Sequence, residues 1–451
     1  MQHLDIRLGA TRYLLCDPQT TPDGKPAGYG NMLRNAEQAT RTAAALGATL
    51  LFIPSGRPLN AAVFDLESPD VTILGQSDWR APALRALWRI ATPVRYGAPG
   101  AWTASTTASL VRPAVHPVMH LARRRGWREA DRRLDRFGHA CRRVANSYEK
   151  RVTDAWRALF GEARERARAT DSKRQRIRLR LRRDAQASVD ELARRAGLDP
   201  QRPMVILHVR ESGYRQRGAE RQQVMDRVRD ARIETYRPAI EWLVERGYQV
   251  VRIGDPSMTP CAWPGVIDLA TAPWRTGAFE LWAAINSRFF ITGDSGPYFL
   301  AQLVGVPSLS VNVFRAGYNT IRESDRYISK RVLDRTRGRH LSIAEMLSDE
   351  FVYSAVDFDR FAWVDNTPDD ILEAVEDMVA ALDDPDLPRT AAQQRHDEVL
   401  SRLAPRKMID GRAQPSLLAR KGGRGTLSPG FAARYFDSTP ADRLEQGPRM
   451  R

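Results

Sequence analysis

The stretch from residue 289 to residue 312, FFITGDSGPYFLAQLVGVPSLSVN, constrains the fold of this 451-residue sequence more than any other part. It begins with an apolar, β-prone run at Phe289–Thr292, which is typical of a buried strand. Gly293–Gly296 then allow a sharp turn into a helix, and Gly305 ends that helix. A second apolar run follows at Ser308–Val313. The pattern predicts strand, tight loop, helix and strand, with the loop at the carboxyl end of a strand.

A loop of this kind favours an anionic ligand. In open α/β sheets, ligands bind at the carboxyl ends of the strands, where backbone N–H groups of a loop and a first helical turn can meet a phosphate. The loop consists of Gly293, Asp294, Ser295 and Gly296. The alternative is that this GDSG sequence is only a well-capped connection, since short glycine-rich loops are weak signals on their own.

The composition indicates a globular protein with acidic partners. Apolar residues make up 42% of the chain, and the formal net charge is +16, which favours phosphorylated ligands, an anionic membrane surface or nucleic acid. Cys16, Cys141 and Cys261 form no CxxC pair, which disfavours a disulfide framework or a zinc site. The sequence contains no signal-peptide pattern and no apolar run of about 18 residues. We therefore expect a cytoplasmic protein, either soluble or peripheral on the inner face of the cell membrane.

The first 78 residues alternate between strand and helix patterns. Arg12–Cys16 and Thr49–Ile53 are apolar runs that predict strands, and Met32–Leu46 is an alanine-rich helix after a glycine-rich loop at Gly28–Asn31. This alternation predicts one half of a Rossmann-like domain. The GYGN loop is not a GxGxxG fingerprint, so a dinucleotide site is not favoured there.

Residues 79–200 are rich in arginine and are expected to be a mainly helical insert in the first domain. One interpretation is an ordinary solvated helical face. A second is that residues 122–184 bind anionic lipid head groups. A nucleic-acid surface is the least favoured interpretation, because no nucleic-acid-binding motif accompanies the charge.

Residues 201–382 predict a second, complete doubly wound domain. Met204–Val209, Tyr248–Ile253 and Val266–Leu269 are strand patterns that precede the one at residue 289, and helix patterns separate them. Residues 383–451 are predicted to form a polar tail, in which only Pro429–Tyr435 is apolar enough to dock on the fold.

Three loops of the second domain follow strands and should meet at one edge of the sheet. Arginine forms two-pronged contacts with phosphate oxygens, and glycine turns let the backbone approach them, so the pattern predicts a diphosphate site. We expect this site to contain Arg210, Arg252, Gly293, Asp294, Ser295 and Gly296, with His208, Ser212, Tyr214 and Asp255 as further candidates.

Three of these candidates have a structural alternative. His208 could be a core histidine bonded to the backbone, and Arg252 could be an ion-pair partner of Asp255. Tyr214 could be a packing residue. The sequence has no Walker A motif, HExxH, GxSxG or acidic pair at metal-ligand spacing, which favours a metal-independent transferase without a cofactor over a hydrolase or NTPase.

The segment from Val205 to Leu309 resembles the nucleotide-sugar half of GT-B glycosyltransferases. Its parts LHVRESGY, IETYRPAIEWLVERGYQVVRIGDPSM and RFFITGDSGPYFLAQLVGVPSLSVN are similar to a group of bacterial glycosyltransferases associated with surface polysaccharide synthesis. HVR resembles the His-x-Arg motif of fucosyltransferase-like enzymes, in which the arginine contacts the donor diphosphate. DSGPYFLAQLVGVP resembles the donor loop and helix of heptosyltransferases.

The resemblance implies a GT-B fold of two Rossmann-like domains that face a cleft, with the acceptor in the first and the donor in the second. It implies transfer of a sugar from a nucleotide-diphosphate sugar to a surface glycan or lipid-linked acceptor, with Arg210 and Asp294–Gly296 in the donor site. The first domain usually supplies the catalytic base of such enzymes, and Asp17, Asp23 and His3 are unranked candidates. The competing hypothesis is a non-catalytic scaffold or binding module whose basic insert docks on membrane or nucleic acid.

Overall fold

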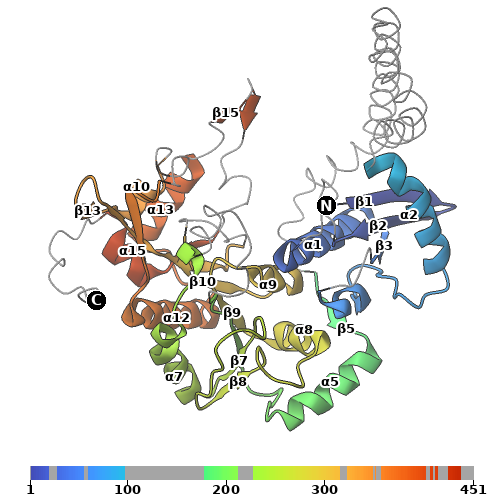
Figure 1. Ribbon diagram of the computed structural model, residues 1–451, viewed down its shortest axis with the longest axis horizontal. Helices are drawn as coiled ribbons and strands as arrows, with labels where there is room; N and C mark the ends of the chain where they lie inside the picture. The colour runs from blue at the N-terminus through green and yellow to red at the C-terminus, as the bar shows by residue number, and fades with distance from the viewer. Residues whose placement is uncertain are drawn as a thin grey trace, which may run out of the picture. The chain divides into compact units, whose positions relative to one another are not determined.

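The computed structural model (Figure 1) is of mixed α/β class, and its described residues fall into two compact units. The first unit comes from residues 1–27, 35–58 and 64–177, and the second from residues 28–34, 59–63 and 178–451. The described parts of the chain are residues 2–19, 28–54, 59–96, 177–211, 227–314, 322–348, 351, 357–402, 407–409, 412–414 and 425–437.

The first unit contains a three-stranded sheet in the order β1-β2-β3. Strand β1 (Gln2–Leu8) pairs antiparallel with β2 (Thr11–Asp17), which pairs parallel with β3 (Thr49–Phe52). Strand β1 was not predicted, although Leu4, Ile6 and Leu8 alternate with Asp5 and Arg7 at the spacing of a half-buried strand. The other elements of this part of the chain are α1 (Tyr29–Leu46), the 3₁₀ helix η1 (Ala61–Asp65), β4 (Leu66–Glu67) and α2 (Ala81–Tyr96).

The second unit is built on a seven-stranded parallel sheet with the order β17-β11-β10-β9-β6-β7-β8. Counted from β6, six of these strands have the 3-2-1-4-5-6 order of a Rossmann fold. The strands are β6 (Met204–Leu207), β7 (Gln249–Arg252), β8 (Val266–Asp268), β9 (Phe289–Thr292), β10 (Ser308–Val313), β11 (Arg326–Ser329) and β17 (Thr426–Leu427).

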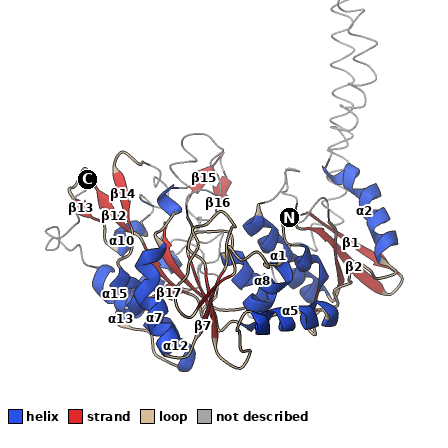
Figure 2. Ribbon diagram, turned by 60° about the horizontal axis from the view of Figure 1, so that its bottom comes forward, coloured by secondary structure: helices blue, strands red, loops and turns tan. Residues whose placement is uncertain are grey.

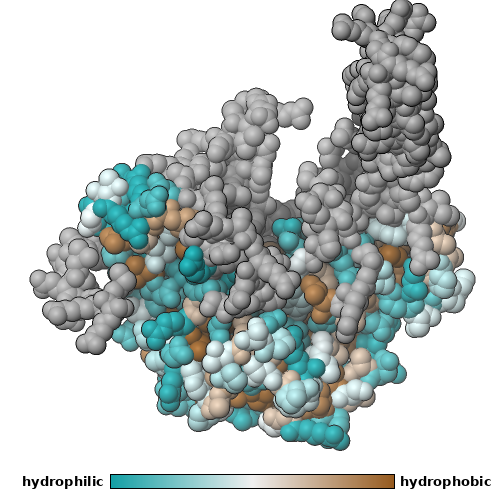
Figure 3. Space-filling view, in the orientation of Figure 1, coloured by the Kyte–Doolittle hydropathy of each residue, from teal (hydrophilic) through white to brown (hydrophobic). Residues whose placement is uncertain are grey.

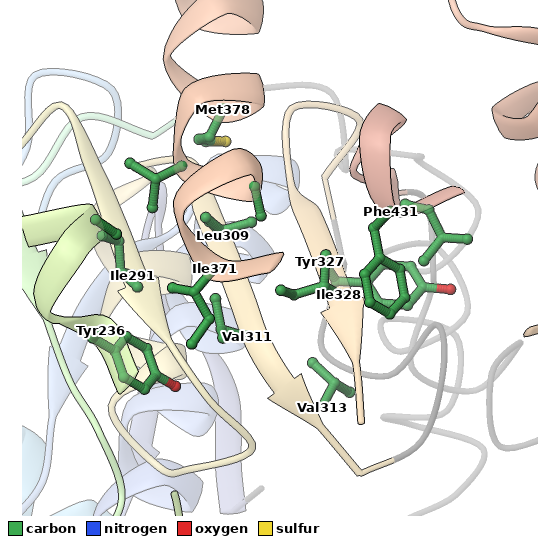
Figure 4. Close-up of a cluster of buried hydrophobic side chains, with 14 of the residues drawn as sticks. Tyr236, Ile291, Leu309, Val311, Val313, Tyr327, Ile328, Ile371, Met378 and Phe431 are labelled. Carbon is green, nitrogen blue, oxygen red and sulfur yellow. The ribbon is translucent and has the colours of Figure 1, made fainter. Parts of the chain in front are cut away.

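Helices cover both faces of this sheet (Figure 2). On one face, Ile291, Leu309 and Val311 pack with Ile371 and Met378 of α12 in a large apolar core (Figure 4). Because side chains alternate along a strand, the neighbouring residues of β6 and β9 face the other helical layer. The covering helices are α7 (Arg237–Glu245) and α12 (Pro368–Asp383) on the first face, and α5 (Arg183–Arg195), α8 (Gly277–Asn286) and α9 (Tyr298–Val304) on the second.

Local sequence signals explain where several of these helices begin and end. Thr276 caps α8, because its hydroxyl accepts a hydrogen bond from the Phe279 N–H. Thr367 and Asp370 form a capping box at the start of α12. Gly305 ends α9 in the left-handed conformation, with φ of 79°.

The remaining described elements are mostly short. A small antiparallel sheet has the order β13-β12-β14, and a two-stranded sheet joins β15 and β16. These elements are β5 (Arg180–Leu181), the 3₁₀ helix η3 (Ile233–Tyr236), β12 (Arg331–Asp334), β13 (Arg339–His340), α10 (Ile343–Met346), β14 (Phe361–Val364), α13 (Ala391–Arg402), β15 (Lys407–Ile409), β16 (Arg412–Gln414) and α15 (Pro429–Tyr435).

The second unit extends further along the chain at both ends than residues 201–382. Its long carboxyl-terminal part begins at Arg178, because α5 packs on α8 and the Trp282 indole N–H donates a 2.9 Å hydrogen bond to Asp190. The expectation of a tail from residue 383 is wrong, since β17 is the seventh strand of the sheet and α13 packs on α15. The predicted docking of Pro429–Tyr435 agrees with α15, in which Phe431 and Ala432 are buried.

The visible described surface is mainly hydrophilic, with hydrophobic residues in small groups (Figure 3). Trp79 is the most exposed of the large hydrophobic side chains in the described residues, at 84%. Within the described helices, none has the length and apolar character that crossing a membrane requires.

Candidate functional site

The sheet of the second unit reverses its direction of growth between β6 and β9. From β6 the chain moves outward to β7 and β8, then returns to the other side of β6 and continues through β9, β10 and β11. The crevice outside the carboxyl ends of the two strands at such a switch point is the usual ligand site of this architecture. Here those ends lead into His208–Glu211 and Gly293–Gly296, so two of the three predicted loops meet at the switch point.

His208 ties three strand ends together. Its Nδ1 lies 3.0 Å from the Ile253 carbonyl oxygen, after β7, and its Nε2 lies 2.9 Å from Ser295 Oγ, after β9. A carbonyl oxygen only accepts hydrogen bonds, so Nδ1 carries the proton. In the neutral imidazole, Nε2 therefore accepts from the Ser295 hydroxyl. His208 is therefore bonded to the backbone, as the core-histidine alternative predicts, and it also contacts the GDSG loop directly.

Burial lowers the pKa of His208 to about 4, and the charges of Arg210 and Arg252 lower it as well. In the unfolded chain a histidine titrates near about 6.5, so between these two values the unfolded state binds more protons than the folded state. We therefore expect the free energy of unfolding to fall as the pH drops from about 6.5 to 4, by on the order of 3 kcal/mol from this residue.

Urea unfolding of wild type and of His208→Asn at pH 7 and pH 4.5 measures this contribution. Asparagine does not titrate in this range, so the variant should lose less stability on acidification than wild type does. The buried His396, whose pKa is lowered to about 3, is present in both proteins and cancels in the difference. Equal acid sensitivity of the two proteins would contradict the assignment of a neutral His208.

The GDSG loop is held by hydrogen bonds of its own backbone. The Ser295 N–H donates to the Gly293 carbonyl at 2.8 Å, so it is not available to a ligand in this conformation. Helix α9 begins at Tyr298, after the loop and Pro297, and has seven residues. The loop thus forms a turn before the helix, and in the described chain the Gly296 N–H donates to no backbone carbonyl.

Gly296 packs closely against Gly30 of residues 28–34, which belong to the same unit. A Cβ atom added to Gly30 would lie 2.5 Å from Gly296 Cα, closer than side-chain atoms approach one another. Gly30 therefore requires glycine, whereas a Cβ atom at Gly296 would lie 3.0 Å from the Gly30 nitrogen and would need a small local shift. The sequence marked the GYGN loop as glycine-rich, but no local signal could indicate that it lies against the GDSG loop.

Arg210 follows β6 and is held by an acidic partner. Its Nε donates a 3.0 Å hydrogen bond to Asp230, and both side chains are largely buried, with exposures of 13% and 17%. The Asp230 carbonyl in turn accepts from Lys330, whose ammonium also binds Asp365 at 2.6 Å. Asp230 therefore fixes the direction of the arginine at the switch point.

Arg252 has a structural environment that corrects its predicted role. The side chain is fully buried and forms ion pairs with Glu211 at 2.6 Å and Asp268 at 3.0 Å, while the Thr259 carbonyl accepts a further hydrogen bond. A diphosphate could reach it only if these pairs opened. Its partner is also not Asp255, the one considered from the sequence.

Asp255 closes a turn of its own. Its carboxylate accepts hydrogen bonds from the Ser257 N–H at 3.0 Å and the Ser257 hydroxyl at 2.6 Å. This is the local pattern by which aspartate stabilises turns, and it accounts for the residue without a ligand.

Several predicted site residues lie outside the described residues. Ser212, Tyr214 and Asp23 belong to this group, as does the basic stretch 122–184 up to residue 176. His3 lies in β1, and its side chain is not described. Asp17 ends β2 and is buried, and its Oδ1 accepts from the Gln19 N–H at 2.9 Å. Its role as a base stays a prediction.

Arg229 is a site residue that the sequence did not single out. Its Nε donates a 2.8 Å hydrogen bond to the Asp294 carbonyl, so this arginine contacts the GDSG loop directly. Arginines recur between Arg215 and Arg232 in the sequence. Because arginines recur throughout that stretch, their pattern could not indicate which one contacts the GDSG loop.

Metal ligands do not cluster in the described chain, which holds no group of three or more His, Cys, Asp or Glu side chains that could bind an ion. Independence from metal therefore stays a prediction that needs its own measurement.

Comparison with protein-family models and with curated proteins finds no match. Among solved structures, the chain is similar to the glycosyl transferase family 9 protein from Veillonella parvula DSM 2008, with 18% sequence identity and a TM-score of 0.24. The match covers 33% of this chain and 40% of that protein. At this identity and TM-score, the likeness does not indicate a shared substrate or activity.

Proposed function

We propose that the protein is a glycosyltransferase of GT-B type that binds a nucleotide-diphosphate sugar at the β6/β9 switch point. The observation that carries the proposal is the convergence of Arg210, Arg229 and the GDSG loop at this point. Two guanidinium groups and a glycine turn suit a diphosphate, because arginine stays charged and presents paired donors to its oxygens.

The proposed chemistry needs these donors most when the glycosidic bond breaks. The bond between the sugar and the diphosphate oxygen breaks as the acceptor oxygen bonds to the sugar, and the leaving diphosphate gains negative charge. Arg210, oriented by Asp230, would stabilise that charge without reorganising. The proton of the acceptor hydroxyl goes to a base that remains to be assigned.

Ser295 would have a different role from the arginines. Its hydroxyl proton is directed to His208, so its oxygen presents lone pairs to the ligand. Lone pairs suit a hydroxyl group of the ribose or the sugar better than a phosphate oxygen. We therefore place the diphosphate at Arg210 and the Gly296 N–H, with Ser295 accepting a hydrogen bond from a ligand hydroxyl.

A thermal-shift panel of GDP, UDP, ADP, CMP and dTDP tests the proposal, because a ligand that binds the folded state raises its melting temperature. We expect one nucleotide to raise the melting temperature of wild type, and Ser295→Ile to abolish the shift by filling the loop. The matched control is Ser257→Ile, which changes an exposed serine of the β7 turn. An equal shift in all three proteins would place the nucleotide elsewhere.

The finer parts of the proposal concern the acceptor, the metal and the membrane. We infer a surface-glycan or lipid-linked acceptor and docking of residues 122–184 on anionic lipid, which would bring the enzyme to such an acceptor. The nucleotide shift and sugar transfer should persist in EDTA. Nucleotide binding with no transfer to any glycan or lipid-linked acceptor would favour the non-catalytic binding module instead.

A further inference from the structure

Arg34 is a partly buried cation that has no counterion among the described residues. It lies in the second turn of α1, within residues 28–34 of the second unit, and its side chain is partly buried. Its Nε is buried without a hydrogen-bond partner, and no described carboxylate forms an ion pair with its guanidinium. Burial lowers the pKa of this arginine, with no acidic residue to offset the effect.

Two buried arginines near the switch point have acidic partners. Arg252 has Glu211 and Asp268, and Arg210 has Asp230. Proteins rarely bury a charge without such a partner, because the lost hydration is not replaced. The ring of Phe299, 5.8 Å from the Arg34 guanidinium carbon, supplies only a weak cation–π attraction. The described surroundings of Arg34 therefore supply no negative charge to balance its own.

The position of Arg34 relates it to the GDSG loop through two neighbouring contacts. Gly30 lies four residues before Arg34 on α1 and packs on Gly296. Phe299 lies four residues after Ser295, and its ring meets Arg34. Residues four apart lie on one face of a helix, so Gly30 and Arg34 share a face of α1. Their partners Gly296 and Phe299 are three residues apart, at the end of the GDSG loop and the start of α9.

We propose that Arg34 binds an anionic group, a phosphate or a carboxylate, of a ligand held at the GDSG loop. The planar guanidinium can form two parallel hydrogen bonds to such a group. The group belongs either to the nucleotide itself or to a phosphorylated acceptor beside it. This inference rests in part on the proposed nucleotide site, but it concerns a residue on a different element.

The test uses isothermal titration of the full-length chain with the nucleotide selected by the thermal-shift panel. We expect Arg34→Gln to weaken nucleotide binding about tenfold to a hundredfold, as expected for loss of a charge-assisted contact, and Arg34→Lys to weaken it less. A second titration adds inorganic pyrophosphate to nucleotide-saturated protein. If Arg34→Gln binds nucleotide normally but no longer binds pyrophosphate, the Arg34 site is supported and the anionic group belongs to the acceptor.

Arg41→Gln is the matched control, because it removes the same charge from the same helix. Arg41 pairs with Glu37, so it has a counterion of its own. The melting temperature of the empty protein provides a second readout. Removal of an unpaired buried charge should leave it unchanged or raise it in Arg34→Gln, whereas a structural arginine would lower it.

Equal responses of wild type and Arg34→Gln in both titrations, including no response in either protein, overturn the proposal. A lower melting temperature of the empty variant overturns it as well. Arg210→Ala separates this inference from the proposed function. If Arg210→Ala binds nucleotide normally and Arg34→Gln does not, the Arg210 site is wrong and the Arg34 site stands. If Arg34→Gln responds like wild type in both titrations and Arg210→Ala does not bind nucleotide, only the Arg34 site is rejected.

Discussion

Replacing Arg210 by alanine is expected to slow glycosyl transfer by about a hundredfold or more, comparable to the removal of one preorganised donor from a transition state. The residue follows the central strand β6, and Asp230 fixes its Nε at 3.0 Å. Arg210→Lys keeps the charge but loses the planar fork, so its loss should be smaller. Initial rates of transfer from the identified nucleotide sugar measure both effects.

The ion pair with Asp230 also predicts a stability change in Arg210→Ala. Because the pair is largely buried, we expect a loss of about 1.5–3 kcal/mol, the range for hydrogen bonds to charged groups. Arg237→Ala is the control, since Arg237 forms an exposed ion pair with Glu241 on α7, and such pairs contribute about 0–1 kcal/mol. If folded Arg210→Ala transferred sugar at the wild-type rate, the donor site would not lie at this residue.

Replacing Arg252 by methionine is expected to destabilise the protein by about 3–5 kcal/mol, because it leaves two carboxylates in a largely buried site without their cation. Arg252 is fully buried between Glu211 and Asp268. Asp268 also accepts hydrogen bonds from the Cys261 N–H and the Thr271 hydroxyl, so its displacement would disturb the loops after β7 and β8. Urea unfolding monitored by circular dichroism measures the loss.

Two further variants make this prediction specific. Arg252→Met combined with Glu211→Gln and Asp268→Asn should recover part of the stability, because the unpaired charges are removed together. Arg246→Met is the control, since Arg246 is exposed and contacts only the Trp242 ring and carbonyl in the described structure. A stable Arg252→Met variant that had lost only nucleotide binding would restore the diphosphate role predicted from the sequence.

Local sequence patterns determined the strands and turns on which the site is built. The apolar runs at β6, β9 and β10 predicted buried strands, and Gly305 predicted the end of α9. Pro429–Tyr435 was predicted to dock because its apolar residues needed cover, and Phe431 is buried in the core. Such signals are readable because each depends on the residue itself or on neighbours a few positions away.

The tertiary structure decided which polar residues of the strand-end loops have partners and which face a ligand site. Arg210 and Arg252 both follow apolar runs and look alike in the sequence. Only the fold brings Glu211, 41 residues away, and Asp268, 16 residues away, around Arg252. The fold likewise brings Ser295 to His208 across 87 residues, and α9 to Arg34. No local pattern encodes these side-chain contacts, because they depend on which distant strands pair and on the order of the sheet. Burial then determines how much each contact contributes to stability.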